Sequence, residues 1–144
     1  MSIYKKLLKE LFSSQYYAVL CSVEKGQPYC NLVAFAATED LKCLIFVTNR
    51  NTRKYRNIVG NNRISLLIDS RSNKPADINE AIAITIIGSA HEETDHKRGF
   101  YSIFLKKHPH INQFVDNPDS VLIVITVSKY IIAGFDKVQE IAIN

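Results

Sequence analysis

The chain has 144 residues, of which 47% are hydrophobic and 22% are charged, and its formal net charge is +4. This composition indicates one globular domain over residues 1–144 and excludes a disordered or collagen-like chain, because the sequence is too apolar and too poor in glycine and proline for either. The weak positive charge is compatible with nucleic acid, with an anionic small molecule, or with solubility alone.

The first half of the chain begins with a predicted amphipathic helix, because apolar residues recur at helical spacing over residues 3–13. Apolar and branched segments separated by turn residues follow, and they predict an antiparallel meander. Its three strands are expected at 16–23, 29–37 and 42–48. A short helix is then expected over 52–60, with Asn51 or Thr52 as its cap.

The second half alternates further strands with helical segments. Strands are expected at 63–69 and 81–90, on either side of a polar loop at 70–80, and helices at 94–107 and 109–115. The apolar run 121–127 is typical of a strand buried on both faces, and 130–135 and 138–143 form a closing strand pair. About seven short strands without regular βαβ alternation predict a mainly β protein, an antiparallel barrel with added helices.

The cysteines Cys21, Cys30 and Cys43 lie in predicted strands and have no metal-binding spacing. This pattern predicts three reduced thiols in the core of a cytoplasmic protein, and no metal site. Lys9 and Glu10 interrupt the apolar N-terminal stretch, so no signal peptide is expected. No apolar run approaches the roughly 18 residues that a membrane span needs.

The strongest local signal is the segment TNRNTRKYR at residues 48–56, between a predicted strand and a predicted helix. Cations are unfavourable at a helix N-terminus unless an anion occupies the exposed N–H groups. Four of them crowd this one: Arg50, Arg53, Lys54 and Arg56. Three neutral donors accompany them: Thr48, Asn49 and Thr52. The residues alone fit an anion site and a solvated basic helix start equally well.

Basic residues on the first and the later predicted helices leave nucleic-acid binding as a further alternative. No aromatic platform accompanies them, however, and a solvated helix face explains them more simply. We therefore expect no nucleic-acid partner.

The chain resembles the pyridoxamine 5'-phosphate oxidase-like family of FMN-binding split barrels. The resemblance rests on five runs: NLVAF at 31–35, LIFVTN at 44–49, TRKYRNI at 52–58, NNRISL at 61–66 and FLKKHP at 104–109. It implies a split antiparallel β-barrel of the FMN-binding type, with an N-terminal helix and a helical segment before the last strands. It also implies a homodimer with FMN at the subunit interface.

The resemblance also implies which residues touch the flavin. Arg53 and Lys54 would hold the phosphate, and the strand-end residues would lie beside the ribityl chain and the ring. The partner subunit would contribute from the strand near 81–84 and from Ser70 and Arg71. The full implied set is Asn31, Leu32, Val33, Ala34, Val47, Thr48, Asn49, Thr52, Arg53, Lys54, Ser70 and Arg71.

The chain departs from the vitamin-processing members of the family. They carry a lysine where this chain has Phe35-Ala36-Ala37, and a glutamine where it has Ala83 or a neighbouring residue. They end in a tryptophan and an arginine, and this chain has no tryptophan. The implied function is thus an FMN-dependent oxidoreductase acting on an unidentified small molecule. The alternative is a non-catalytic protein that binds flavin, haem or a deazaflavin. No catalytic side chain is expected, because the cofactor carries the chemistry.

Two apolar strands, 81–87 and 121–127, exceed what the wall of one small barrel needs. We expect them to pair the subunits of the homodimer.

Overall fold

The computed structural model of the chain describes residues 2–95, 98–111, 116–134 and 136–144. Its strands are β1 (Tyr17–Glu24), β2 (Gln27–Ala34), β3 (Ala36–Ala37), β4 (Cys43–Asn49), β5 (Arg63–Asp69), β6 (Ala83–Glu92), β7 (Ser120–Ala133) and β8 (Val138–Ala142). Its helices are α1 (Ser2–Ser14), α2 (Arg53–Gly60), α3 (Asp77–Glu80), α4 (Phe100–Lys107) and the 3-10 helix η2 (Pro109–Ile111).

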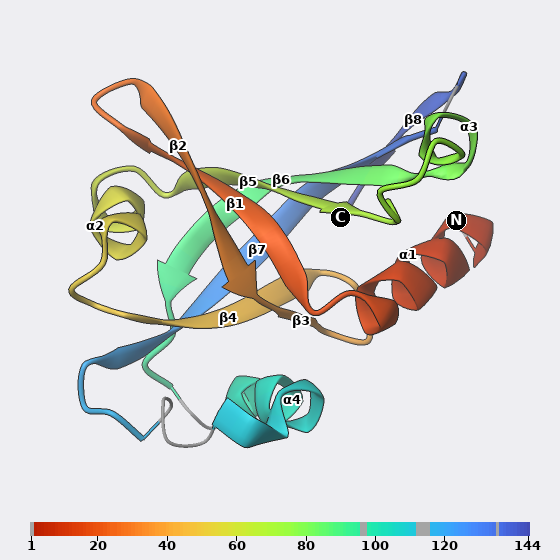
Figure 1. Cartoon of the computed structure of the whole chain (residues 1–144). Helices are drawn as coiled ribbons and strands as arrows, with labels where there is room; N and C mark the ends of the chain where they lie inside the picture. The colour runs from red at the N-terminus through yellow and green to blue at the C-terminus, as the bar shows by residue number, and fades with distance from the viewer. Residues whose placement is uncertain (1, 96–97, 112–115, 135) are drawn as a thin grey trace.

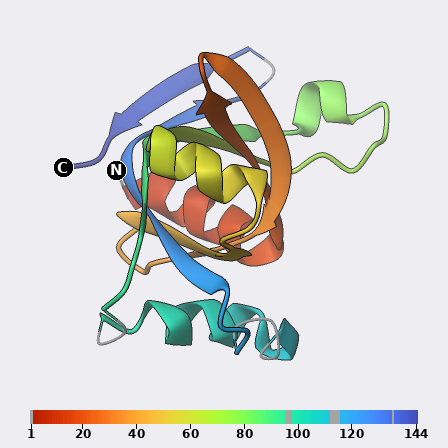
Figure 2. The ribbon, with the colours of Figure 1, turned by 90° about the vertical axis from the view of Figure 1, so that its left-hand side faces the viewer.

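The strands form a single antiparallel sheet in the order β2-β1-β5-β6-β7-β4-β3, with β8 paired to β7. The sheet curls until β2 lies against β4 without pairing with it, which leaves the barrel split (Figure 1). Helix α2 covers one end of the barrel and α1 lies toward the other (Figures 1 and 2). The predicted mainly β split barrel is confirmed.

The β1–β2 hairpin closes through a two-residue turn. Lys25 and Gly26 both have positive φ angles, of 50° and 80°, as a type I′ turn requires. This turn places Glu24 opposite Gln27 and so fixes the register of the whole hairpin. Strand β2 accordingly begins earlier than the predicted strand 29–37. It ends at Ala34, and Phe35 separates it from β3.

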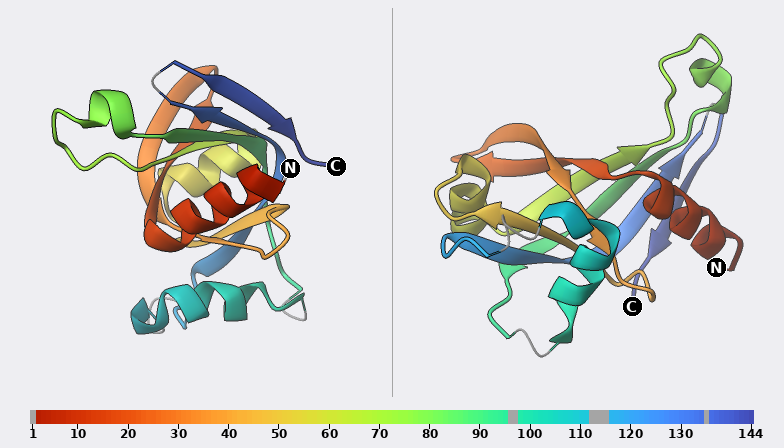
Figure 3. Two further views of the ribbon diagram at one scale, coloured as in Figure 1. Left: turned by 90° about the vertical axis from the view of Figure 1, so that its right-hand side faces the viewer. Right: turned by 60° about the horizontal axis from the view of Figure 1, so that its bottom comes forward.

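Two further segments differ from the sequence-based expectation. Strand β7 is one continuous strand, where the sequence suggested a break between 127 and 130. The polar loop 70–80 contains α3, because the Asp77 carboxylate accepts hydrogen bonds from the N–H groups of Ser72 and Asn73 and so folds the loop back. Figure 3 shows α3 and its loop projecting from the sheet.

Helix α4 is shorter than the expected helix over 94–107. It begins at Phe100, because Gly99 adopts a left-handed conformation with φ of 75°. Of the expected helix over 109–115, the structure describes only η2, and residues 112–115 lie outside the described residues. Phe135, the expected end of a closing strand, also lies outside them.

The barrel core is formed by inward side chains of the curled sheet together with the buried face of α1. A second apolar cluster lies on the other face of β7, where Leu122 and Val124 pack against Phe100 and Phe104 of α4. Of the run 121–127 predicted to be buried on both faces, residues 121–125 are buried, whereas Thr126 is exposed. The covering element is α4 of the same chain, so the expectation that this run pairs two subunits is wrong.

Helix α4 is anchored to the end of α1 by its last residues. The Lys107 ammonium donates hydrogen bonds to the carbonyl oxygens of Phe12 and Gln15, both at 2.6 Å. Burial lowers the pKa of Lys107 to about 8. His108 Nε2 donates to the Phe35 carbonyl at 2.8 Å, so that this nitrogen carries the ring proton. These polar contacts fix α4 over β3 and β4.

No helix in the described residues is both long enough and apolar enough to cross a membrane.

Gly88 lies where the pairing of β6 with β7 shifts register. A Cβ at this position would lie 2.4 Å from the Thr126 carbonyl oxygen, and this backbone atom cannot turn aside as a flexible side chain can. We expect Gly88→Ala to lower the free energy of unfolding by about 1–3 kcal/mol. Gly60→Ala is the matched control, because no atom lies within 4 Å of its added Cβ. Urea unfolding of both variants tests the expectation, and equal midpoints would contradict it.

Candidate functional site

The junction between β4 and α2 is built by its own polar side chains. Thr52 caps α2: its hydroxyl donates to the Asn49 carbonyl at 2.7 Å and accepts from the Tyr55 N–H at 3.4 Å. The Thr48 hydroxyl is buried and lies 3.3 Å from that of Thr52. Asn49 Oδ1 accepts from the Asn51 N–H at 2.8 Å. These predicted site residues are brought together, and their first role is to hold the helix start in place.

Arg53 and Lys54 occupy the first turn of α2. The Arg53 guanidinium is exposed and lies 4.9 Å from the centre of the Tyr29 ring on β2. Lys54 is half-buried, and desolvation lowers the pKa of its ammonium. Across the described ranges neither residue forms an ion pair. Two cations without a carboxylate partner thus lie at the positive end of a helix.

The other two cations of the predicted cluster, Arg50 and Arg56, contact neighbouring segments of the chain. The Arg56 side chain donates to the Asn51 carbonyl at 3.3 Å. Arg50 is exposed, and its backbone N–H donates to the Asp119 carbonyl at 2.9 Å. The side-chain contacts therefore set only Arg56 apart, and Arg53 and Lys54 are the two remaining cations that lie in the helix itself.

The predicted ring-binding residues of β2 divide between the two faces of the strand. Asn31 pairs with Leu20 and faces inward, whereas Leu32 faces outward and is 65% exposed. Asn31 Nδ2 donates to the Leu32 carbonyl at 3.3 Å, but its Oδ1 is buried and has no hydrogen-bond partner in the structure. Val33 faces the core, and Ala34 and Val47 are half-buried. A buried acceptor without a donor marks Asn31 as the unsatisfied group of this strand.

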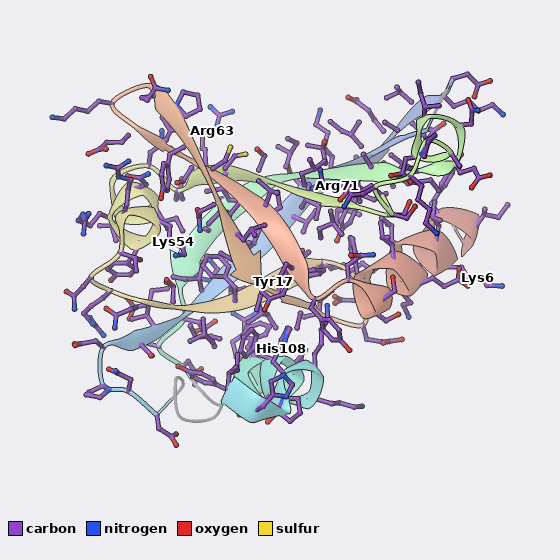
Figure 4. The ribbon with its side chains drawn as sticks, viewed as in Figure 1. Lys6, Tyr17, Lys54, Arg63, Arg71 and His108 are labelled. Carbon is purple, nitrogen blue, oxygen red and sulfur yellow. The ribbon has the colours of Figure 1, made fainter. Side chains whose placement is uncertain are left out.

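Ser70 and Arg71 lie at the far end of β5 from α2. The Ser70 hydroxyl accepts from the Ile82 N–H at 2.8 Å, and Arg71 forms an ion pair with Asp69 at 3.0 Å. Figure 4 labels Lys54 at the left of the molecule, beside α2, and Arg71 nearer its centre. A single chain therefore does not bring these two residues to the Arg53–Lys54 pair, and only a second subunit could do so.

The residues that support α2 from the neighbouring strands were not predicted from the sequence. The Tyr55 hydroxyl donates to Glu92 of β6 at 2.6 Å, and this hydrogen bond raises the pKa of Tyr55. Asn57 Nδ2 donates to the buried Ser22 hydroxyl of β1 at 3.1 Å. Tyr29 lies against Arg53. The one available signal for Tyr29 was its spacing of two from Asn31, which puts both on one strand face.

Within the ranges that the structure describes, no group of three histidine, cysteine, aspartate or glutamate side chains is placed to hold a metal ion.

Comparison with known proteins assigns the family. The family model described as "Pyridoxamine 5'-phosphate oxidase" matches residues 4–132, which is nearly the whole chain. The chain belongs to the pyridoxamine 5'-phosphate oxidase family. No curated protein matches the sequence.

Solved structures similar to this member of the pyridoxamine 5'-phosphate oxidase family support the split-barrel fold. A haem-binding protein from Mycobacterium smegmatis has a TM-score of 0.83 at 16% identity, and the alignment covers 96% of this chain but only 57% of the mycobacterial one. A protein related to general stress protein 26 from Clostridium acetobutylicum has a TM-score of 0.76 at 18% identity, with coverage of 99% and 96%.

A third similar structure is named as a flavin-binding protein. The FAD-binding protein from Mesorhizobium loti has a TM-score of 0.68 at 16% identity, and the alignment covers 87% of this chain and 88% of that one. At these identities the likeness establishes the fold that the pyridoxamine 5'-phosphate oxidase family shares. The haem and the FAD in these names are ligands of the neighbouring proteins.

Proposed function

We propose that the protein is a homodimeric FMN-binding protein whose Arg53 and Lys54 hold the flavin phosphate. The observation that carries the proposal is the half-buried Lys54 ammonium, which has a lowered pKa and no carboxylate partner in the described residues. A phosphate would compensate its desolvation and would accept charge-assisted hydrogen bonds from both cations. The positive end of the α2 dipole adds to the attraction.

The remaining donors and acceptors fit a flavin as well. The Asn31 Oδ1 atom lacks a donor, and the isoalloxazine ring carries a polar N–H that could supply one. Arg53 reaches over Tyr29, which stands two residues before Asn31 on the same face of β2. One strand therefore contributes to both ends of the proposed site. FMN is favoured over larger flavins by the family resemblance carried by residues 52–58.

The proposed homodimer rests on the outer face of the sheet. One row of paired residues runs across five strands, and we name it the outer row: Leu32, Val19, Leu67, Thr85 and Ile131. All but Thr85 are apolar, whereas the solvated face of an antiparallel sheet is ordinarily polar. We infer that a second copy of the chain covers this row, in an interface of the obligate class that buries about 2,000 Å² or more. The family resemblance implies that the partner also contributes residues to the flavin site.

When bound, FMN supplies a ring that accepts a hydride or single electrons. The chain's own residues bind and orient: Arg53 and Lys54 fix the phosphate, and β2 lies along the ring. The inferred activity is that of an oxidoreductase acting on a small molecule, and no side chain is assigned a catalytic role. The expectation of a cytoplasmic protein stays a prediction.

Haem is the second candidate ligand, because the mycobacterial neighbour with a TM-score of 0.83 is named as haem-binding. A carboxylate of haem could occupy the same pair of cations. The absorption spectrum of the purified protein distinguishes the candidates. Flavin bands support the proposal, a Soret band favours haem, and a colourless protein that binds neither added FMN nor added haem contradicts both. Bleaching of the flavin bands by NAD(P)H would further support an enzyme over a carrier.

We expect the protein not to oxidise pyridoxamine 5'-phosphate efficiently. The stretch that would carry the family's substrate-binding lysine is Phe35-Ala36-Ala37, in which Phe35 and Ala36 are buried and Ala36 packs in the apolar cluster under α4. A substrate phosphate without its clamp loses charge-assisted contacts, each worth about tenfold or more in affinity. Stopped-flow mixing of the FMN-loaded protein with this substrate measures the effect. Rapid flavin reduction that saturates at micromolar substrate would contradict the expectation.

A further inference from the structure

Two cysteines face each other across the β1–β2 hairpin. Cys21 and Cys30 are directly paired in the register of the two strands, and their sulfur atoms lie 3.0 Å apart. Cys30 is exposed and Cys21 is half-buried. The expectation of three thiols in the core is therefore wrong for this pair, because both side chains lie on the outer face of the sheet.

The register places this pair at a site where side chains approach closely. Pro28 has no N–H group and stands opposite Val23, so that this pair is of the non-hydrogen-bonded kind. Pair types alternate along an antiparallel ladder, and Cys21–Cys30 lies two residues further from the turn. It is therefore also a non-hydrogen-bonded pair, in which opposing Cα atoms are about 4.5 Å apart, within the span that a disulfide bridges.

We propose that Cys21 and Cys30 form a reversible cross-strand disulfide when the protein meets a peroxide. The exposed Cys30 acts as the attacking thiol and Cys21 as the resolving thiol, in an arrangement typical of redox-sensing cysteine pairs. Burial and the neighbouring Cys30 raise the pKa of Cys21, which favours this division of roles. The proposal stands independently of flavin binding.

The reaction balances with hydrogen peroxide as the named oxidant. The Cys30 thiol first gives up its proton, and the thiolate attacks one peroxide oxygen. The O–O bond breaks, Cys30 becomes a sulfenic acid, and the departing hydroxide takes up a proton to give one water. The Cys21 sulfur then attacks the Cys30 sulfur and displaces a second water as it loses its own proton. The two thiols give up two electrons and two protons, and the peroxide is reduced to two waters.

The third cysteine is a natural internal reference. Cys43 lies on β4, is half-buried beside the apolar cluster under α4, and burial raises the pKa of its thiol. Strand β4 pairs with β3 and β7, not with the β1–β2 hairpin. Cys43 is therefore expected to stay a thiol under the same treatment.

Thiol counting on cysteine variants tests the proposal. The Cys43→Ser variant is treated with a small excess of hydrogen peroxide, denatured, and titrated with a thiol reagent, and its digest is analysed by mass spectrometry. We expect both titratable thiols to disappear, a Cys21–Cys30 crosslinked peptide to appear, and dithiothreitol to restore both thiols. In Cys21→Ser, the same treatment leaves a sulfenic acid on Cys30 that dimedone traps.

Three results would overturn the proposal. The first is a Cys43→Ser variant that keeps both thiols after treatment. The second is a stable sulfenic acid on Cys30 despite the presence of Cys21. The third is a disulfide between two chains, seen as a dimer on a non-reducing gel, in place of the hairpin crosslink.

Discussion

Replacing Arg53 by alanine is expected to weaken FMN binding about 10–150-fold, because a hydrogen bond to a charged group contributes roughly 1.5–3 kcal/mol. Riboflavin lacks the phosphate, so the wild-type protein should bind it weakly and the substitution should change its affinity little. Fluorescence titration of the apoprotein with each flavin measures both affinities.

The matched controls remove a positive charge elsewhere. Arg63 is exposed at the start of β5, and Lys106 lies in the last turn of α4. Arg63→Ala and Lys106→Ala are expected to change FMN affinity by less than about threefold, because exposed charges at a distance are screened by salt. Equal losses for FMN and riboflavin in Arg53→Ala would place Arg53 away from the phosphate.

Replacing Leu67 by arginine is expected to dissociate the homodimer. Leu67 stands at the centre of the outer row, between Val19 and Thr85. A two-fold axis repeats the substitution in both subunits. If each copy costs about 2 kcal/mol, as a buried hot-spot residue does, the dissociation constant rises about 10³-fold. Light scattering at micromolar concentration should then give the mass of one chain, where the wild type gives twice that mass.

The control for this substitution is Ile78→Arg, since Ile78 is 72% exposed on α3, which projects from the sheet. It should leave the dimer intact. Because the proposed flavin site is shared, Leu67→Arg should also lose FMN affinity while Ile78→Arg keeps it. A monomeric wild-type protein, or a Leu67→Arg variant that stays dimeric, would contradict the proposed interface.

The sequence predicted those parts of the fold that depend on local patterns. Alternation marked β5, helical spacing marked α1, and the polar run after β4 marked the capped start of α2. Strand β7 was harder, because Ser128 and Lys129 resemble a break. In the sheet the Ser128 hydroxyl donates to the Ile87 carbonyl at 2.9 Å, beside the register shift, and the strand continues. Such a contact between distant segments leaves no local pattern.

In the candidate site, too, local patterns predicted some residues, and contacts between distant segments determined the others. Arg53, Lys54 and Thr52 were predicted because a helix start is a local feature. Tyr29 under Arg53 depends on how the sheet curls to bring β2 beside α2, which no local pattern encodes. The facing cysteines could have been predicted from the sequence, because a two-residue turn at Lys25-Gly26 sets Cys21 opposite Cys30. The strands expected at 16–23 and 29–37 leave residues 24–28 between them, and this wider gap concealed the pairing.

A crystal structure of the protein grown with FMN tests the central claim most directly. The account predicts a flavin phosphate in contact with the side chains of Arg53 and Lys54, the ring beside Asn31, and a second copy of the chain covering the outer row. A flavin whose phosphate lies away from α2, or a protein that binds no FMN at saturating concentration, would contradict the account.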